Sequence, residues 1–130
     1  MHVHLILQVW LASKFHRQYQ LMAGCAGAVV LGVRDLEIKD GSWRKGTKEE
    51  ISLSDRYMST EWTQIEAGMA VMAGLPVLIV SETGIRGGVF DVGTSEHLLY
   101  RCGVDDLPGS TALRDWCMVV RLAASQPRAG

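Results

Sequence analysis

Glu66 is the residue of this chain with the clearest potential for chemistry. It lies in the segment STEWTQIEAGMAVMAGLPVLIV (59–80), where small and apolar residues surround it on a predicted helix. Burial would raise the pKa of its carboxyl group, which could then act as a general acid, a general base or a nucleophile. Thr63 and Glu66 also fit a capping box, in which the glutamate bonds back to the threonine amide. Because capping carboxylates far outnumber catalytic ones, the residues alone favour the structural interpretation.

Three further features could line a ligand site, and each has a structural alternative. Trp62 precedes Glu66 by one helical turn, so its ring could stack on a base or a nicotinamide, although a core position is commoner. Gly84–Gly88 surrounds Arg86 and could bind a phosphate, but it matches neither the P-loop nor the GxGxxG pattern, which favours a flexible turn. Asp91 could act as an acid or a base, and a solvated surface position is its simpler explanation.

Hydrophobic spacing predicts the elements that position these residues. The helix that carries Glu66 has a stripe of large apolar residues widened by alanines, so we expect most of it to be buried. We expect Gly74 to cap its C-terminus, before a strand at Val77–Val80 that is covered on both faces. Ala26–Val33 is a similar apolar run, and it predicts a second buried strand that is parallel to the first. The stripe consists of Trp62, Ile65, Met69 and Met72.

The N-terminal half outside this core contains one helix and one long excursion. Ser13–Ala23 has amphipathic spacing and ends before a glycine, which predicts a helix. His2–Trp10 can be a strand or an extension of that helix, and its alternation favours the strand. Residues 34–57 are rich in charge, and we expect a hairpin with a turn signal at Asp40-Gly41. Because long loops in small domains are often functional, this excursion is a candidate lid or partner surface.

The C-terminal part is expected to complete one small domain. Ser110 can cap a short helix through Asp115, Cys117–Leu122 is expected to form a last strand, and Ala123–Gly130 is expected to be a disordered tail. Residues 1–122 would then form a single α/β domain, with three layers and a short, mainly parallel sheet.

Composition excludes several classes of protein. The chain has 130 residues, 48% of them hydrophobic and 21% charged, which is sufficient for one packed core. A net charge of -1 argues against a nucleic-acid binder. Leu5–Ala12 is too short to span a membrane. The three cysteines lack CxxC spacing and the histidines show only a weak His2-x-His4 pattern, so we predict no metal site and a reducing, cytoplasmic location.

The segment around Glu66 resembles two families of enzymes. Ser59, Trp62 and Glu66 resemble the serine, tryptophan and glutamate of NAD-cleaving TIR domains. The continuation EAGMA, followed by GLPV (74–77), is similar to the helix and strand that carry the nucleophilic glutamate of nucleoside 2-deoxyribosyltransferases. Both families have a flavodoxin-like, Rossmann-like architecture, and both attack the N-glycosidic carbon of a nucleoside or dinucleotide. The resemblance therefore implies that Glu66 is catalytic and that Trp62 forms a wall of the pocket.

The chain also departs from these families. Residues 1–24 contain no glycine- or serine-rich ligand loop, which implies a shortened or altered first βα unit. The transferases take an asparagine from a neighbouring subunit, and this chain contains no asparagine. An uncovered sheet edge would favour pairing with a second chain, so we expect a homodimer or a higher homo-oligomer.

Two functions remain open from the sequence. The first is binding of a nucleotide or nucleoside, with N-glycosidic cleavage through Glu66, no cofactor, and NAD as a candidate substrate. The second is a non-catalytic interaction or ligand-sensing module on a degenerate TIR-like scaffold, so the residues leave open whether the protein is an enzyme. The predicted ligand-binding residues are Ser59, Trp62, Arg86, Gly87 and Asp91.

Overall fold

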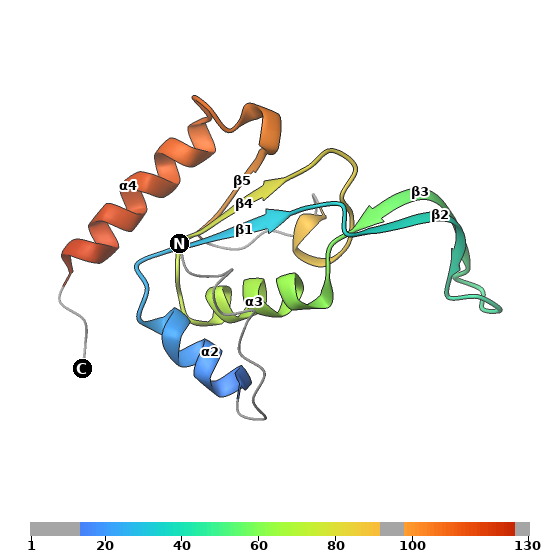
Figure 1. The fold of residues 1–130 in the computed structure, drawn as a ribbon, viewed down its shortest axis with the longest axis horizontal. Coiled ribbons are helices and arrows are strands. Elements are labelled where there is room, and N and C mark those ends of the chain that lie inside the picture. Colours follow the sequence, from blue (N-terminus) through green and yellow to red (C-terminus); the bar gives the residue numbers. More distant parts are fainter. Residues whose placement is uncertain (1–13, 92–97, 127–130) are drawn as a thin grey trace.

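Three parallel strands form the centre of the fold. The computed structural model of the chain describes residues 14–91 and 98–126. In it β1 (Ala28–Gly32), β4 (Val77–Ser81) and β5 (Leu99–Gly103) pair in the order β1-β4-β5 (Figure 1). Both pairings are parallel, which confirms the predicted pairing of the first two strands. The segment His2–Trp10 lies outside the described residues.

Helices cover both faces of this sheet. α2 (Lys14–Ala23) and α3 (Glu61–Met72) lie on one face, and α4 (Thr111–Ser125) lies on the other (Figure 1). The α3 side holds the larger core cluster, and the α4 side holds a smaller cluster around Trp116. The fold is therefore a small three-layer, Rossmann-like α/β fold, as predicted.

Both ends of α3 are fixed by local hydrogen bonds. At the amino end Thr60 is the N-cap, and its side chain accepts a hydrogen bond from the Thr63 amide at 3.4 Å. At the carboxyl end the Gly74 amide donates to Val71 O and the Leu75 amide to Ala70 O, which is the Schellman arrangement. Gly74 has a φ of 74°, so the predicted glycine cap is confirmed.

The buried face of α3 differs from the predicted stripe. Its buried residues are Glu66, Ala67 and Ala70, whereas the Met72 side chain is 80% exposed. The prediction was wrong because it ranked positions by hydrophobicity. Small alanine side chains let the helix backbone approach the sheet closely, and larger residues would hold it away.

α4 also corrects the sequence prediction. A single helix capped by Ser110 replaces the expected short helix and the strand at Cys117–Leu122, and it continues to Ser125, beyond the predicted end of the domain. Its inward side chains follow helical spacing, with Leu113, Trp116 and Val120 packed in the core beneath it. The Trp116 indole also donates to Pro76 O at 2.9 Å.

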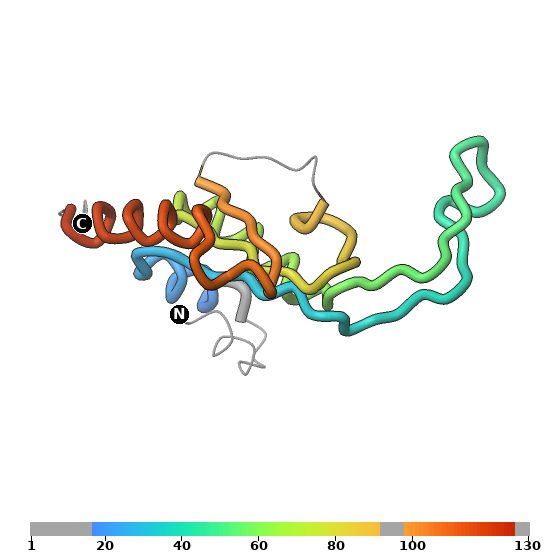
Figure 2. The backbone as a smooth tube through the Cα atoms, turned by 90° about the horizontal axis from the view of Figure 1, so that it is seen from above, coloured from blue at the N-terminus to red at the C-terminus, as the bar shows by residue number. Residues whose placement is uncertain are grey.

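The excursion after β1 is a two-stranded antiparallel ribbon. β2 (Leu36–Trp43) pairs with β3 (Ile51–Met58), and the ribbon, residues 36–58, extends away from the rest of the molecule (Figures 1 and 2). We call it the arm. The predicted hairpin is confirmed, but the predicted turn at Asp40-Gly41 is wrong. Those residues lie within β2, and the chain reverses at 44–50, where Gly46 has a φ of 80° and Arg44 forms an ion pair with Glu49.

Two short 3-10 helices complete the described residues, η1 (Gly88–Phe90) after β4 and η2 (Val104–Asp106) after β5. Within residues 14–91 and 98–126, no helix has both the length and the apolar character needed to cross a bilayer.

Gly68 within α3 and Gly74 just after its end are expected to respond in opposite directions to the same substitution. Gly68→Ala should stabilise the protein by about 0.5–1 kcal/mol, since a methyl group there meets nothing within 4 Å and alanine favours a helix. Gly74→Ala should destabilise it by about 1 kcal/mol, because the left-handed φ of the cap disfavours a side chain. Urea unfolding of the two variants measures both effects, and changes of the same sign would contradict this account of α3.

Candidate functional site

A loop after β4 meets the amino end of α3 at the carboxyl edge of the sheet. Gln64 of α3 joins the two. Its Nε2 atom donates to Gly87 O at 3.0 Å, and its Oε1 atom accepts a hydrogen bond from the Val89 amide at 3.0 Å. The same Nε2 atom lies 3.4 Å from Ser59 Oγ, at the end of the segment that connects the arm to α3. We call residues 82–91 the glycine loop and the contacts of Gln64 the clasp.

Several amides of the glycine loop already donate hydrogen bonds within the protein. The Gly87 amide donates to Asp91 Oδ1 at 2.8 Å, and the Arg86 amide donates to Tyr57 O at 2.9 Å. The amides of Phe90 and Asp91 turn back to carbonyls within the loop. In this conformation these amides are not directed at a ligand, so the loop does not form the amide cradle for phosphate that Gly84–Gly88 suggested.

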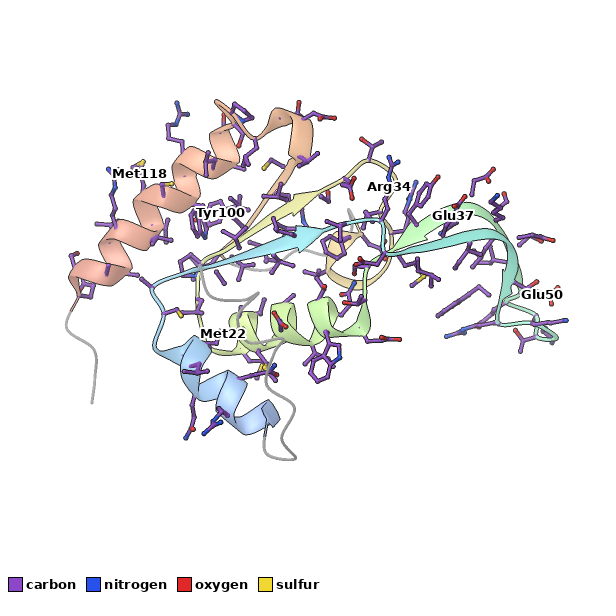
Figure 3. All side chains as sticks on the ribbon, viewed as in Figure 1. Met22, Arg34, Glu37, Glu50, Tyr100 and Met118 are labelled. Carbon is purple, nitrogen blue, oxygen red and sulfur yellow. The ribbon has the colours of Figure 1, made fainter. Side chains whose placement is uncertain are left out.

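Two arginines beside the loop also bind within the protein. The Arg34 guanidinium donates to Thr83 O from Nε at 2.9 Å and from Nη2 at 2.6 Å, and it lies 4.7 Å from the centre of the Tyr57 ring. Figure 3 shows Arg34 at the root of the arm. On the other side Arg101 of β5 donates to Val89 O. Burial lowers the pKa of the Arg101 guanidinium, and the nearby Asp91 carboxylate opposes that shift.

Glu66 lies on the buried side of α3, together with Ala67 and Ala70. Its side chain is 1% exposed, and its Oε1 atom has no hydrogen-bond partner within the described residues. The capping-box interpretation is wrong, because the N-cap of α3 is Thr60 and not Thr63. Thr63 therefore occupies the third helical position, which is where a capping-box glutamate would have to be. Burial raises the pKa of the Glu66 carboxyl to about 7. The protein therefore holds a carboxyl group that is partly protonated at neutral pH.

The structure brings together only some of the predicted site residues. Ser59, Gly87 and Asp91 converge around the clasp. The Arg86 side chain is exposed, while Trp62 is half-buried one turn before Glu66 on the same helix. At 1% exposure Glu66 does not open to solvent in this conformation.

Gln64 was not predicted from the sequence. A glutamine in the first turns of a helix normally faces water, and nothing in its neighbours marks it as a contact to a distant loop. The glycine at position 88 is the residue that could have indicated this contact, because a Cβ atom at this position would lie 2.1 Å from Gln64 Oε1. A glycine inside a cluster of glycines is typical of a turn, and Gly88 does have a left-handed φ of 57°. From the sequence, a glycine required by the close contact with Gln64 therefore could not be distinguished from a glycine required by a turn.

Other possible sites lie elsewhere or do not form. An open cavity of about 410 Å³ runs along α4, on the opposite face of the sheet from Glu66, and Leu113, Arg114 and Met118 help to line it. In the parts of the chain that are described, no three histidine, cysteine, aspartate or glutamate side chains gather as a metal site would require. Cys25, Cys102 and Cys117 are free thiols.

Comparisons of the chain with models of protein families, with curated proteins and with solved structures found no match.

Proposed function

We propose that this protein binds a nucleoside at the carboxyl edge of the sheet, between the glycine loop and the amino end of α3, and cleaves its N-glycosidic bond through Glu66. The observation that carries the proposal is the buried Glu66 carboxyl, which has an unpartnered Oε1 atom and a pKa of about 7. Such a group destabilises the fold at neutral pH, and perturbed carboxyl groups of this kind concentrate at functional sites. Ligands of parallel α/β sheets also bind at this edge.

A carboxylate at this position would act as a nucleophile. Its oxygen would attack the anomeric carbon of the sugar as the bond from that carbon to the base breaks, and the base would leave with a proton from water or from a protonated carboxyl group. Water or a second base would then release the sugar from the glutamate. The attacking atom must reach the sugar, so the glycine loop has to move away from the clasp while substrate enters.

The surroundings favour a nucleoside over a phosphorylated nucleotide. Arg34 and Arg101 already donate to carbonyl oxygens, and most amides of the glycine loop have internal acceptors. Ser59 and Asp91 place side-chain oxygen atoms beside the loop, and such oxygens suit hydrogen bonds to sugar hydroxyl groups. NAD would need Arg86 for its pyrophosphate, since this exposed side chain is the nearest cation in the loop.

The second candidate is a non-catalytic ligand-sensing or interaction module, and the 1% exposure of Glu66 favours it. In that case the glutamate would be a remnant of a site and the arm would be the functional surface. Self-association and a cytoplasmic location are part of both proposals, the latter because all three cysteines are free thiols.

Release of free base separates the two candidates. Purified protein is incubated with deoxynucleosides and, separately, with NAD, and free base is followed by chromatography. We expect base from the deoxynucleosides, at least a hundredfold less with Glu66→Gln, and unchanged release with the control Glu61→Gln, whose exposed side chain lies on the same helix. Release that survives in Glu66→Gln would rule out the nucleophile. No release from any substrate by the wild type, with ligand binding retained, would support the sensing module.

A further inference from the structure

The arm has one long edge that pairs with no strand in the described parts of the chain. β2 pairs with β3 along one side, and its other side is open. The outer side of β3 is blocked at its root, where Tyr57 forms a bridge with Ile85 and accepts a hydrogen bond from the Arg86 amide. The open edge of β2 is therefore the better site for adding a strand.

The arm also exposes large apolar side chains. Leu36 is 52% exposed and Trp43 is 56% exposed, at the two ends of β2, and Ile51 opposite Trp43 is 53% exposed. A two-stranded ribbon that projects from the body, as Figure 2 shows, is only marginally stable in water by itself. Additional strands beside β2 would cover its free amides and carbonyls and part of this apolar surface.

The charges of β2 are complementary to those of a second β2 in antiparallel orientation. A two-fold axis that relates two such strands is perpendicular to their sheet. It must lie midway between the two copies of one residue, because side chains directly opposite each other lie on the same face of the sheet. An axis through Glu37, Lys39 or Asp40 would place that charge opposite its own copy. An axis through Ile38 places isoleucine opposite isoleucine, and it places Glu37 opposite Lys39 of the second copy twice.

We propose that two copies of this chain join through β2, antiparallel about a two-fold axis at Ile38, so that their arms form one four-stranded sheet. The side chains of Glu37 and Lys39 are exposed and Ile38 is half-buried, so all three are available to a partner. Figure 3 shows Glu37 on the half of the arm nearer the body, while Glu50 lies at the far end. This proposal does not depend on any ligand or on Glu66.

Charge reversal tests the register directly. Glu37→Lys and Lys39→Glu each convert two attractive pairs into two repulsive ones, so each variant should dissociate about tenfold or more readily than the wild type. The double variant Glu37→Lys with Lys39→Glu restores both attractive pairs and should return the dissociation constant of the wild type. Sedimentation over a range of protein concentrations measures all four proteins, and circular dichroism verifies that each is folded.

Two results would overturn the proposal. One is a wild-type protein that stays monomeric at the highest concentrations. The other is a dimer that neither single variant weakens, or that the double variant fails to restore. A cysteine at the axis provides an independent measurement. Under mild oxidation Ile38→Cys should form a disulfide-linked dimer, since the two side chains lie directly opposite each other, whereas the matched control Asp40→Cys should not. The wild type, oxidised in parallel, accounts for the native cysteines.

Discussion

At pH 8 the variant Glu66→Leu is expected to be more stable to urea than the wild type by up to about 3 kcal/mol, and by much less at pH 4. The carboxyl group has an ordinary pKa of 4.5 and burial raises it to about 7 in the folded protein. Leucine has a similar size, has no charge to bury and does not leave Oε1 without a partner.

The sign follows from proton binding. Between pH 4.5 and about 7 the unfolded chain has lost the Glu66 proton while the folded protein still holds it, so the folded state binds more protons in this window. The free energy of unfolding therefore falls as the pH rises through this window, and the loss is complete above the folded pKa. The free energy of unfolding of Glu66→Leu should not show this fall with pH. The difference in unfolding free energy between the two proteins should therefore grow with pH and then level off.

Glu61→Gln is the matched control for this experiment. Glu61 lies in the first turn of the same helix with an exposed side chain, so its replacement should leave the pH dependence of the wild type nearly unchanged. Parallel stability curves for the wild type and Glu66→Leu from pH 4 to pH 8 would show that Glu66 is hydrated or paired in solution. The central premise of the proposed site would then be wrong.

Gly88→Ala is expected to destabilise the protein by about 2–3 kcal/mol, because it breaks the clasp. A left-handed φ of 57° costs an alanine about 1 kcal/mol. Its methyl group would also overlap with Gln64 Oε1, which is 2.1 Å from the ideal Cβ position. The glutamine would have to withdraw, and both of its hydrogen bonds to the loop, at Gly87 and Val89, would be lost. Urea unfolding measures the effect.

Gly46→Ala separates the backbone strain from the loss of the clasp. Gly46 also has a left-handed φ, of 80°, but a Cβ atom there meets nothing within 4 Å, so we expect only the strain of about 1 kcal/mol. A double-mutant cycle provides the second test. In a Gln64→Ala background the overlap no longer exists, so Gly88→Ala should cost about as little as Gly46→Ala. Strictly additive effects of Gln64→Ala and Gly88→Ala would contradict the clasp.

Local signals made the central part of the fold predictable. Uninterrupted apolar runs marked β1 and β4 as strands, and Gly74 followed by Pro76 marked the end of α3. β4 is covered on both faces as predicted, but that prediction was wrong for β1, where the Leu31 side chain is 37% exposed. The polar character of the segment after β1 and a turn signal at Asp40-Gly41 indicated a hairpin; the arm confirms the hairpin, although its turn lies at 44–50. In each case the interactions that determine the structure lie within the segment itself, or between segments whose sequence is compatible with only one kind of secondary structure.

Predictions failed where a segment was compatible with two structures. The apolar run from Cys117 suits a strand as well as a helix, and its place in α4 is decided by the sheet surface on which Trp116 packs. The orientation of α3 depends on how closely Ala67 and Ala70 let it approach the sheet, which spacing alone does not reveal. Gln64 illustrates the same limit, since its partners lie in a loop more than twenty residues away along the chain.

The arm has a further consequence for how the chain folds. β1 and β4 are parallel neighbours, and the whole arm and α3 lie between them along the chain. Joining distant segments directly carries a large loss of chain entropy, which makes such pairing slow. The arm is a local hairpin that can form within microseconds, and it brings Leu36 next to Met58. Once the arm has formed, the length of free chain that separates β1 from β4 is effectively much shorter. Substitutions that weaken the hairpin, such as those at its Trp43–Ile51 pair, should therefore slow folding more than they accelerate unfolding.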